Sequence, residues 1–98
     1  MAGYKLSKKA VQDLSEIWAY TAERWSENQA DKYYQLIIDT CDEVALNPKL
    51  GKKYPQVKKG LRGFRVGKHI LFYRQAKPKT IEIIRILHER MDLKFRIG

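Results

Sequence analysis

The sequence predicts an α+β fold, in which an N-terminal antiparallel helix hairpin packs on a mainly antiparallel sheet in the order β-α-α-β-β-β. Two observations carry this prediction. Residues 8–45 have apolar side chains spaced three and four apart, as in helices with one buried face. Residues 62–87 contain three short apolar runs separated by turn residues, as in strands. A chain of 98 residues has room for one such domain, expected over 1–98.

A short strand and a helix are expected at the start of the chain. Tyr4–Leu6 has the length of an edge strand, and Ser7 after it has a side chain suited to a helix N-cap. The helix is expected over Lys8–Arg24, because apolar residues follow at spacings of three and four. Its stripe consists of Val11, Leu14, Ile17, Trp18, Thr21 and Trp25.

A second helix is expected directly after the first. Ser26 and Gln29 have the spacing of a capping box, and Asn47-Pro48 ends the helix. Because only a couple of residues separate the two helices, they should form an antiparallel hairpin. The stripe of the second helix consists of Ala30, Tyr33, Tyr34, Ile37, Ile38, Cys41, Val44 and Ala45.

A basic loop and three strands are expected in the remainder. Residues 48–60 contain prolines and glycines at short intervals, which predicts a loop. Strands are expected over Arg62–Val66, His69–Arg74 and Thr80–Leu87, joined by two tight turns. Residues 92–97 fit either a short strand or an ordered tail.

The third expected strand is apolar on both sides, which predicts a central position in the sheet. Strict alternation divides it into two faces, Ile81, Ile83, Arg85 and Leu87 against Glu82, Ile84, Ile86 and His88. Arg85 is then a charge inside a mostly buried strand, and such a charge needs a partner. We expect an ion pair with a helix carboxylate such as Asp39 or Glu43, or else a position lining a cleft.

Charge is distributed unevenly along the chain. Residues 1–48 hold 5 basic and 8 acidic side chains, a net charge of −3, and residues 49–98 hold 15 basic and 3 acidic ones, a net charge of +12. The basic half favours an anionic partner, either nucleic acid or an acidic protein. A surface that serves only solubility is the alternative. The same two interpretations apply to the lysines of the loop, Lys49, Lys52, Lys53, Lys58 and Lys59.

No motif of a metal, cofactor or phosphate site is present, and no cofactor is expected. The two histidines, nineteen residues apart, lack the spacing of metal ligands. Cys41 is the only cysteine and lies on a helix stripe, as is typical of a small buried side chain. The remaining chemistry is cationic. These side chains either bind an anion or, with His88 as acid or base, cleave RNA without a metal: Arg62, Arg65, Arg74, Arg85, His88 and Arg90.

The cellular location follows from what the sequence lacks. No apolar run approaches the roughly 20 residues of a membrane span. The first residues include no apolar stretch of signal-peptide length. A single cysteine agrees with a reducing compartment. We therefore expect a cytoplasmic protein with no membrane partner.

Two stretches of the sequence carry a family resemblance. They are Gly-Leu-Arg-Gly-Phe-Arg-Val-Gly-Lys-His-Ile-Leu-Phe-Tyr-Arg (60–74) and Ile-Glu-Ile-Ile-Arg-Ile-Leu-His-Glu-Arg-Met-Asp (81–92). Both resemble ParE toxins, which belong to the RelE/ParE superfamily of type II toxin–antitoxin systems. The ending Arg-Ile-Leu-His-x-x-x-Asp is the most specific part, and Ile17-Trp18-Ala19-Tyr20 is similar as well. The resemblance covers essentially the whole chain.

The resemblance implies a toxin that inhibits DNA gyrase by stabilising its cleaved DNA complex, and that acts by binding rather than hydrolysis. A cognate ParD-like antitoxin would wrap its C-terminal segment around the toxin, and operator DNA would be contacted only through that antitoxin. We expect the basic sheet face and the C-terminal end to meet gyrase, through Arg62, Arg65, Arg74, Arg85, His88 and Arg90. The expected antitoxin contacts are Trp18, Trp25, Tyr34 and Arg74.

A second function remains open at this point. RelE-like relatives of the same superfamily cleave mRNA on the ribosome with a basic site and a C-terminal tyrosine or histidine. Basic residues occupy comparable places here, but no tyrosine follows Tyr73. A ribosome-dependent endoribonuclease would use His88, Arg65 and Arg85. A nucleic-acid-binding module without toxicity is the third alternative.

Overall fold

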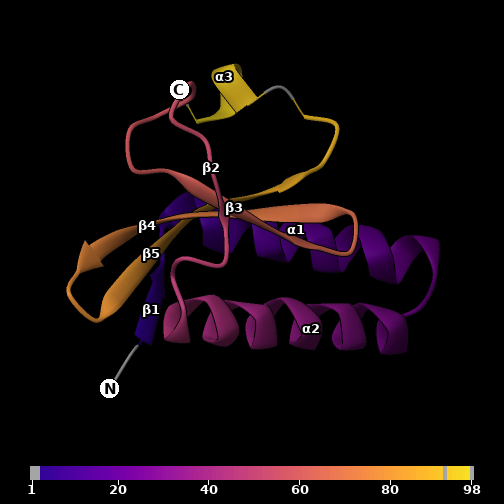
Figure 1. Cartoon of the computed structure of the whole chain (residues 1–98). Coiled ribbons are helices and arrows are strands. Elements are labelled where there is room, and N and C mark those ends of the chain that lie inside the picture. The colour runs from indigo at the N-terminus through magenta and orange to yellow at the C-terminus, as the bar shows by residue number, and fades with distance from the viewer. Residues whose placement is uncertain (1–2, 92, 98) are drawn as a thin grey trace.

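Two long helices cover one face of a twisted five-stranded sheet, and a short third helix lies over the opposite face (Figure 1). The structure is a computed structural model that describes residues 3–91 and 93–97. It has the predicted α+β architecture. The elements are β1 (Gly3–Leu6), α1 (Lys8–Arg24), α2 (Glu27–Leu46), β2 (Lys52–Lys53), β3 (Arg62–Val66), β4 (His69–Lys77), β5 (Thr80–His88) and α3 (Leu93–Arg96).

The sheet is mixed, with the strand order β1-β5-β4-β3-β2. Strand β1 runs parallel to β5, and all other neighbours are antiparallel. The predicted edge strand at Tyr4–Leu6 is therefore confirmed as β1. At the other edge, the short strand β2 lies inside the segment that the sequence predicts to be a loop.

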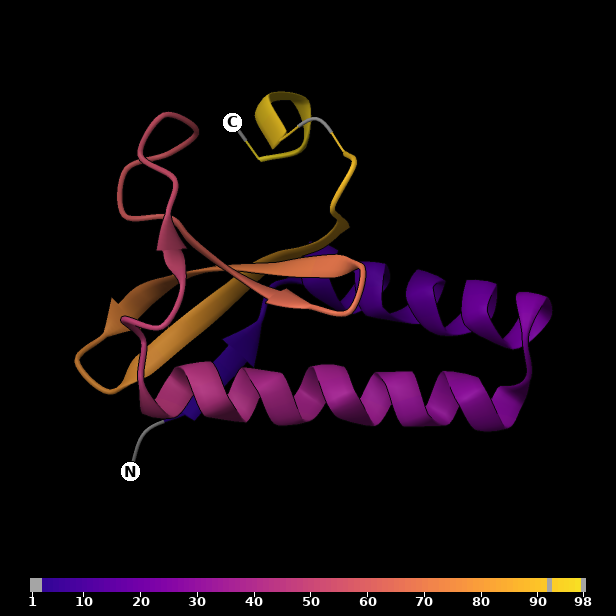
Figure 2. The same cartoon turned by 45° about the vertical axis from the view of Figure 1, so that its right-hand side comes forward.

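The predicted helix hairpin is confirmed, together with its caps. Ser7 Oγ accepts a hydrogen bond from the Ala10 backbone N–H at 3.0 Å, and Ser26 Oγ accepts one from Gln29 at 3.0 Å. These bonds satisfy N–H groups that have no partner within the first helical turn. Helices α1 and α2 then run antiparallel side by side, and their outer halves extend past the sheet (Figure 2).

The main core lies between the helix hairpin and the sheet. Ile37, Cys41 and Val44 of α2 are fully buried there. The adjacent tyrosines diverge, because Tyr33 packs half-buried against this core while Tyr34 is exposed. The sheet contributes Val66, Leu71, Tyr73, Ile81, Ile83 and Ile86.

A β-bulge in β5 makes the predicted strict alternation wrong. Ile83 pairs with Tyr73 and Arg85 pairs with the preceding residue of β4, so Ile84 is an extra residue in β5. The bulge shifts the phase of every side chain beyond it. Ile86 therefore joins Ile83 in the main core, whereas Leu87 lies on the opposite face of the sheet.

A second, smaller core covers that opposite face. Phe72 and Leu87 are buried there beneath Tyr54 and Val57 of the loop and beneath Leu93 of α3. The segment expected to be a short strand or tail is thus a helical turn at 93–96, and Asp92 lies outside the described residues. None of the described helices combines the length and the apolar composition that a membrane crossing requires.

Candidate functional site

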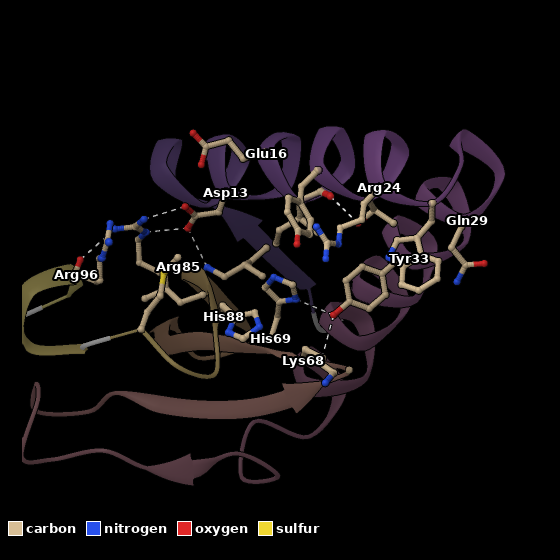
Figure 3. Close-up of a pocket in the computed structure, with 18 residues that line it drawn as sticks. Asp13, Glu16, Arg24, Gln29, Tyr33, Lys68, His69, Arg85, His88 and Arg96 are labelled. Carbon is tan, nitrogen blue, oxygen red and sulfur yellow. Dashed lines mark hydrogen bonds and ion pairs between the residues drawn. The ribbon is translucent and has the colours of Figure 1, made fainter.

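A groove of about 950 Å³ lies where the outer half of α1 extends past the sheet (Figure 3). Helix α1 and the start of α2 form one wall. The β3–β4 turn and the end of β5 form the other. The charged and aromatic side chains that line it are Asp13, Glu16, Tyr20, Arg24, Trp25, Tyr33, Lys68, His69, Arg85, His88 and Arg96.

A hydrogen-bonded aromatic cluster forms the floor of the groove. Tyr33 Oη lies 2.7 Å from His69 Nδ1 and accepts a hydrogen bond from the Lys68 backbone N–H at 3.2 Å. The rings of His69 and His88 meet nearly edge to face, with centroids 5.5 Å apart. The turn at Gly67 needs a glycine, because its φ is +57° and a Cβ there would lie 2.6 Å from Tyr33 Oη.

The electrostatics of this cluster favour uncharged imidazole. Burial lowers the pKa of His69 below its usual value, and the nearby His88 lowers it further. The carboxylates of Asp13 and Glu89 act in the opposite direction with smaller effect. His69 is therefore a neutral hydrogen-bonding group at neutral pH.

A two-armed ion pair closes one end of the groove. Arg85 Nε and Nη2 donate to the two carboxylate oxygens of Asp13, each at 2.8 Å. The Ile86 backbone N–H donates to Asp13 as well, at 3.0 Å. Arg85 Nη1 donates to the Arg96 carbonyl oxygen at 3.1 Å, which ties α3 to β5. The hydrogen bonds to the Asp13 carboxylate raise the pKa of Arg85 above its usual value.

The predicted ion pair of Arg85 with a helix carboxylate is confirmed, but the suggested residues were wrong, because the partner is Asp13 of α1 and not Asp39 or Glu43 of α2. The reason is that β1 pairs with β5 only as far as Ile83. Beyond that point the outer edge of β5 faces the start of α1. Asp13 there accepts from a strand N–H that has no strand neighbour.

Exposed aromatic residues and cations border the other end of the groove. Tyr20 is 61% exposed and Trp25 is 73% exposed. The Arg24 guanidinium lies 5.9 Å from the centre of the Tyr20 ring. Lys68 faces them from the β3–β4 turn. This end offers apolar surface beside positive charge, which suits an amphipathic segment with acidic side chains.

The six residues expected to meet gyrase lie at several places rather than one. Arg85 and His88 line the groove. Arg62 lies at the β2–β3 edge and donates to the Gly51 carbonyl oxygen at 2.9 Å. Arg65 lies on the opposite face of the sheet and pairs with Glu89. The other two are exposed, Arg74 next to Glu82 at 3.4 Å and Arg90 directly after β5.

The residues expected to contact an antitoxin are also dispersed. Trp25 lines the groove. Trp18 is half-buried between the helices, and its Nε1 donates to Asp31 at 2.9 Å. Tyr34 is exposed on α2. Sequence reasoning missed Tyr20 and the other groove residues Arg24, Lys68 and His69, although Ile17, Tyr20 and Arg24 share one helix face by their spacing.

No cluster of three or more metal-ligating side chains occurs within residues 3–91 and 93–97. Cys41 is buried, and burial raises the pKa of its thiol to about 12. A thiol of this kind is a poor nucleophile at neutral pH, because the thiolate is the reactive form.

A family model described as ParE toxin of type II toxin-antitoxin system, parDE, matches residues 4–93. The chain belongs to the ParE toxin family. It is 39% identical to Toxin ParE1 of Mycobacterium tuberculosis over 90 residues, which cover 92% of each protein. It is 35% identical to Toxin ParE1 of Caulobacter vibrioides over the full length of both.

The fold agrees with this family. The structure matches a chain of the chromosomal ParDE TA system from P. aeruginosa with a TM-score of 0.74, over 90% of this chain and 96% of that one, at 24% identity. The family model and the curated relatives together identify the protein as a ParE-family toxin of a parDE type II toxin–antitoxin system.

Proposed function

We propose that this ParE-family toxin inhibits DNA gyrase by trapping its cleaved DNA complex, and that a ParD-like antitoxin neutralises it. The observation that carries the proposal is the family match over residues 4–93. Gyrase acts in the cytoplasm, so the proposal includes a cytoplasmic location. The operator sequence would be recognised only through the antitoxin.

The groove is the proposed docking site of the antitoxin. Monomers rarely leave large aromatic side chains exposed beside a hollow, and here Tyr20 and Trp25 border one. Aromatic anchors in a groove commonly supply most of the affinity for an amphipathic segment. Arg24 and Lys68 would meet its acidic side chains and speed the encounter.

This docking site suggests how neutralisation works. Arg85 and His88 belong to the proposed gyrase-contacting set and also line the groove. An antitoxin segment seated there would cover both. The rest of that set, Arg62, Arg65, Arg74 and Arg90, lies outside the groove. We therefore propose that the antitoxin blocks part of the gyrase-contacting surface.

The alternative of RNA cleavage finds less support in the geometry. His88 faces the helix hairpin, since it stacks on His69, which contacts Tyr33. Arg65 points away from the helices, where it pairs with Glu89. The guanidinium of Arg85 is occupied by Asp13. An acid or base and its phosphate-binding arginines need a shared site within hydrogen-bonding reach, and these three residues do not share one.

Induction of the toxin in bacterial cells would test the proposal. We expect growth arrest with gyrase covalently linked to chromosomal DNA, and intact mRNA. His88→Ala should remain toxic, because it removes one of the six proposed gyrase contacts and leaves the five arginines in place. Ribosome-dependent mRNA cuts that disappear with His88→Ala would contradict the proposal and establish the endoribonuclease instead. A matched Tyr34→Ala variant, altered at an exposed site outside the groove, controls for expression and folding.

A further inference from the structure

A long stretch of this chain carries positive charge without any carboxylate. Between Glu43 and Glu82 the sequence has no acidic residue, yet it has eleven lysines and arginines. Of these, only Arg65 and Arg74 form ion pairs within the described residues, with Glu89 and Glu82 of the following segment. The other cations of this stretch have no acidic partner in the part of the chain that the structure describes.

Six of these cations gather along one border of the sheet, here called the basic edge: Lys49, Lys52, Lys53, Lys58, Lys59 and Arg62. The segment leaves α2, forms β2 beside β3 and continues into a loop at the end of the sheet (Figure 2). All five lysines are exposed. The N-terminal strand β1 forms the opposite edge of the sheet.

The basic edge is an ordered surface and not a free tail. The Tyr54 backbone N–H donates to the Leu61 carbonyl oxygen at 2.9 Å, and the Leu61 N–H donates to the Lys58 carbonyl oxygen at 3.2 Å. Tyr54 also packs edge-on against Phe72 in the second core. Lysine on an edge strand can serve merely to prevent strand pairing. That purpose accounts for the two lysines of β2, but not for those of the loop.

The chemistry of the surface favours the backbone of duplex DNA. Single-stranded nucleic acid is held by exposed aromatic rings that stack on bases. Tyr54 is the only aromatic residue between Lys49 and Arg62, and it is half-buried, with Lys52 Nζ 5.7 Å from its ring centre. An acidic protein would need apolar anchors, and only Leu50 is an exposed large apolar side chain here. A surface that offers lysine charges but no exposed aromatic rings is suited to bind the phosphates of duplex DNA.

We propose that the basic edge binds the phosphate backbone of duplex DNA. The inference rests on the proposed function, since the DNA in question would be the segment that gyrase holds cleaved. The toxin then contacts the DNA as well as the enzyme. The groove lies on the helix side of the sheet and shares no residue with the basic edge. An antitoxin seated in the groove therefore leaves DNA binding intact.

Binding of the purified toxin to a fluorescent duplex of about 20 base pairs, measured by anisotropy at several salt concentrations without gyrase, tests this inference. Phosphate contacts by the five lysines predict a plot of log affinity against log salt with a slope of about −4.5. Lys52→Gln with Lys53→Gln, and separately Lys58→Gln with Lys59→Gln, should each make that slope shallower by about 2. Lys8→Gln with Lys9→Gln, the same charge change at the start of α1, should leave it unchanged.

Equal losses in the basic-edge and α1 variants would overturn the inference, because binding would then follow net charge alone. Tighter binding of single-stranded RNA than of the duplex would overturn it as well. So would a wild-type toxin without measurable duplex affinity at low salt. The proposed function is judged separately, by the trapping of gyrase on DNA. If the wild-type toxin traps gyrase but the basic-edge variants bind duplex DNA as the wild type does, the proposed function stands and only the DNA-binding role of this surface is lost.

Discussion

The Asp13 carboxylate and the Arg85 guanidinium form two parallel hydrogen bonds of 2.8 Å across 72 residues of sequence. The pair is almost completely buried, with side-chain exposures of 7% and 14%. It joins α1 to β5 at the point where β1 ends. Arg85 also reaches the Arg96 carbonyl oxygen, so one guanidinium holds three elements together and closes the groove at one end.

Asp13→Ala should therefore be strongly destabilising. It leaves a mostly buried guanidinium without its counter-charge and the Ile86 N–H without its acceptor. Breaking such a pair typically costs about 3 to 5 kcal/mol. Asp13→Asn should cost less, since an amide oxygen still accepts from Ile86. Chemical denaturation measures both. Glu16→Ala, an exposed change on the same helix, should stay within about 0.5 kcal/mol of wild type, and an equally small effect of Asp13→Ala would contradict the account.

Gly51→Ala should destabilise the protein through Tyr73. The Gly51 N–H donates to Tyr73 Oη at 2.8 Å, and that hydroxyl donates to the Pro48 carbonyl oxygen at 2.8 Å. A Cβ at position 51 would lie 2.4 Å from the same oxygen, so the buried ring has to move. We expect a loss of about 1 to 3 kcal/mol. Gly3→Ala is the matched control, because a Cβ there meets nothing within 4 Å. Equal stability of the two variants would refute this prediction.

Stability should fall as the pH drops through the range in which histidine titrates. Burial, with His88, lowers the pKa of His69 in the folded state. The unfolded chain, with a histidine pKa of about 6.5, then binds more protons than the folded one. The contribution of neutral His69 to folding stability is therefore fully present above about pH 6.5 and is lost as the pH falls below that value. His69→Gln, which can still form a hydrogen bond with Tyr33 Oη, should reduce the difference in melting temperature between about pH 7.5 and pH 5.5. An unchanged difference in this variant would argue against a neutral His69.

Trp25→Ala should weaken antitoxin binding without weakening the fold. The Trp25 side chain is 73% exposed in the free toxin, so its removal costs little packing. As an aromatic anchor in a groove it should contribute about 2 kcal/mol or more, close to 30-fold in affinity. Titration calorimetry with the cognate antitoxin measures this change. Leu46→Ala is the control, since Leu46 is 76% exposed at the far end of α2 and outside the groove. Equal affinities for the two variants would exclude the groove as the docking site.

Local sequence signals predicted most of the fold. Ser7 and Ser26 determine where α1 and α2 begin, because each side chain satisfies a first-turn N–H. Both ends of strand β3 were predicted correctly. For β4 and β5 the first residue was predicted correctly, but each strand extends beyond its predicted last residue. The bulge at Ile84 was not predicted, because both of its flanking faces are apolar and no glycine or proline marks it.

The site was harder to predict than the fold. Its walls come from five separate segments, and only the tertiary arrangement brings them together. No residue near Asp13 in the sequence indicates a pairing with Arg85. The pair forms because β1 ends at Leu6 and leaves the following part of β5 next to α1. Among the residues that were expected to contact an antitoxin, Trp25 does line the groove. The sequence offered no means of separating Trp18, which donates a hydrogen bond to Asp31, from Tyr20, which lines the groove.

The most direct test of the central claim is a supercoiling and cleavage assay of purified DNA gyrase with this toxin added. We expect loss of supercoiling together with accumulation of linear DNA covalently bound to gyrase, and relief of both effects by the cognate antitoxin. An unaffected gyrase, in the presence of folded toxin that still arrests growth, would contradict the claim and direct attention to mRNA on the ribosome.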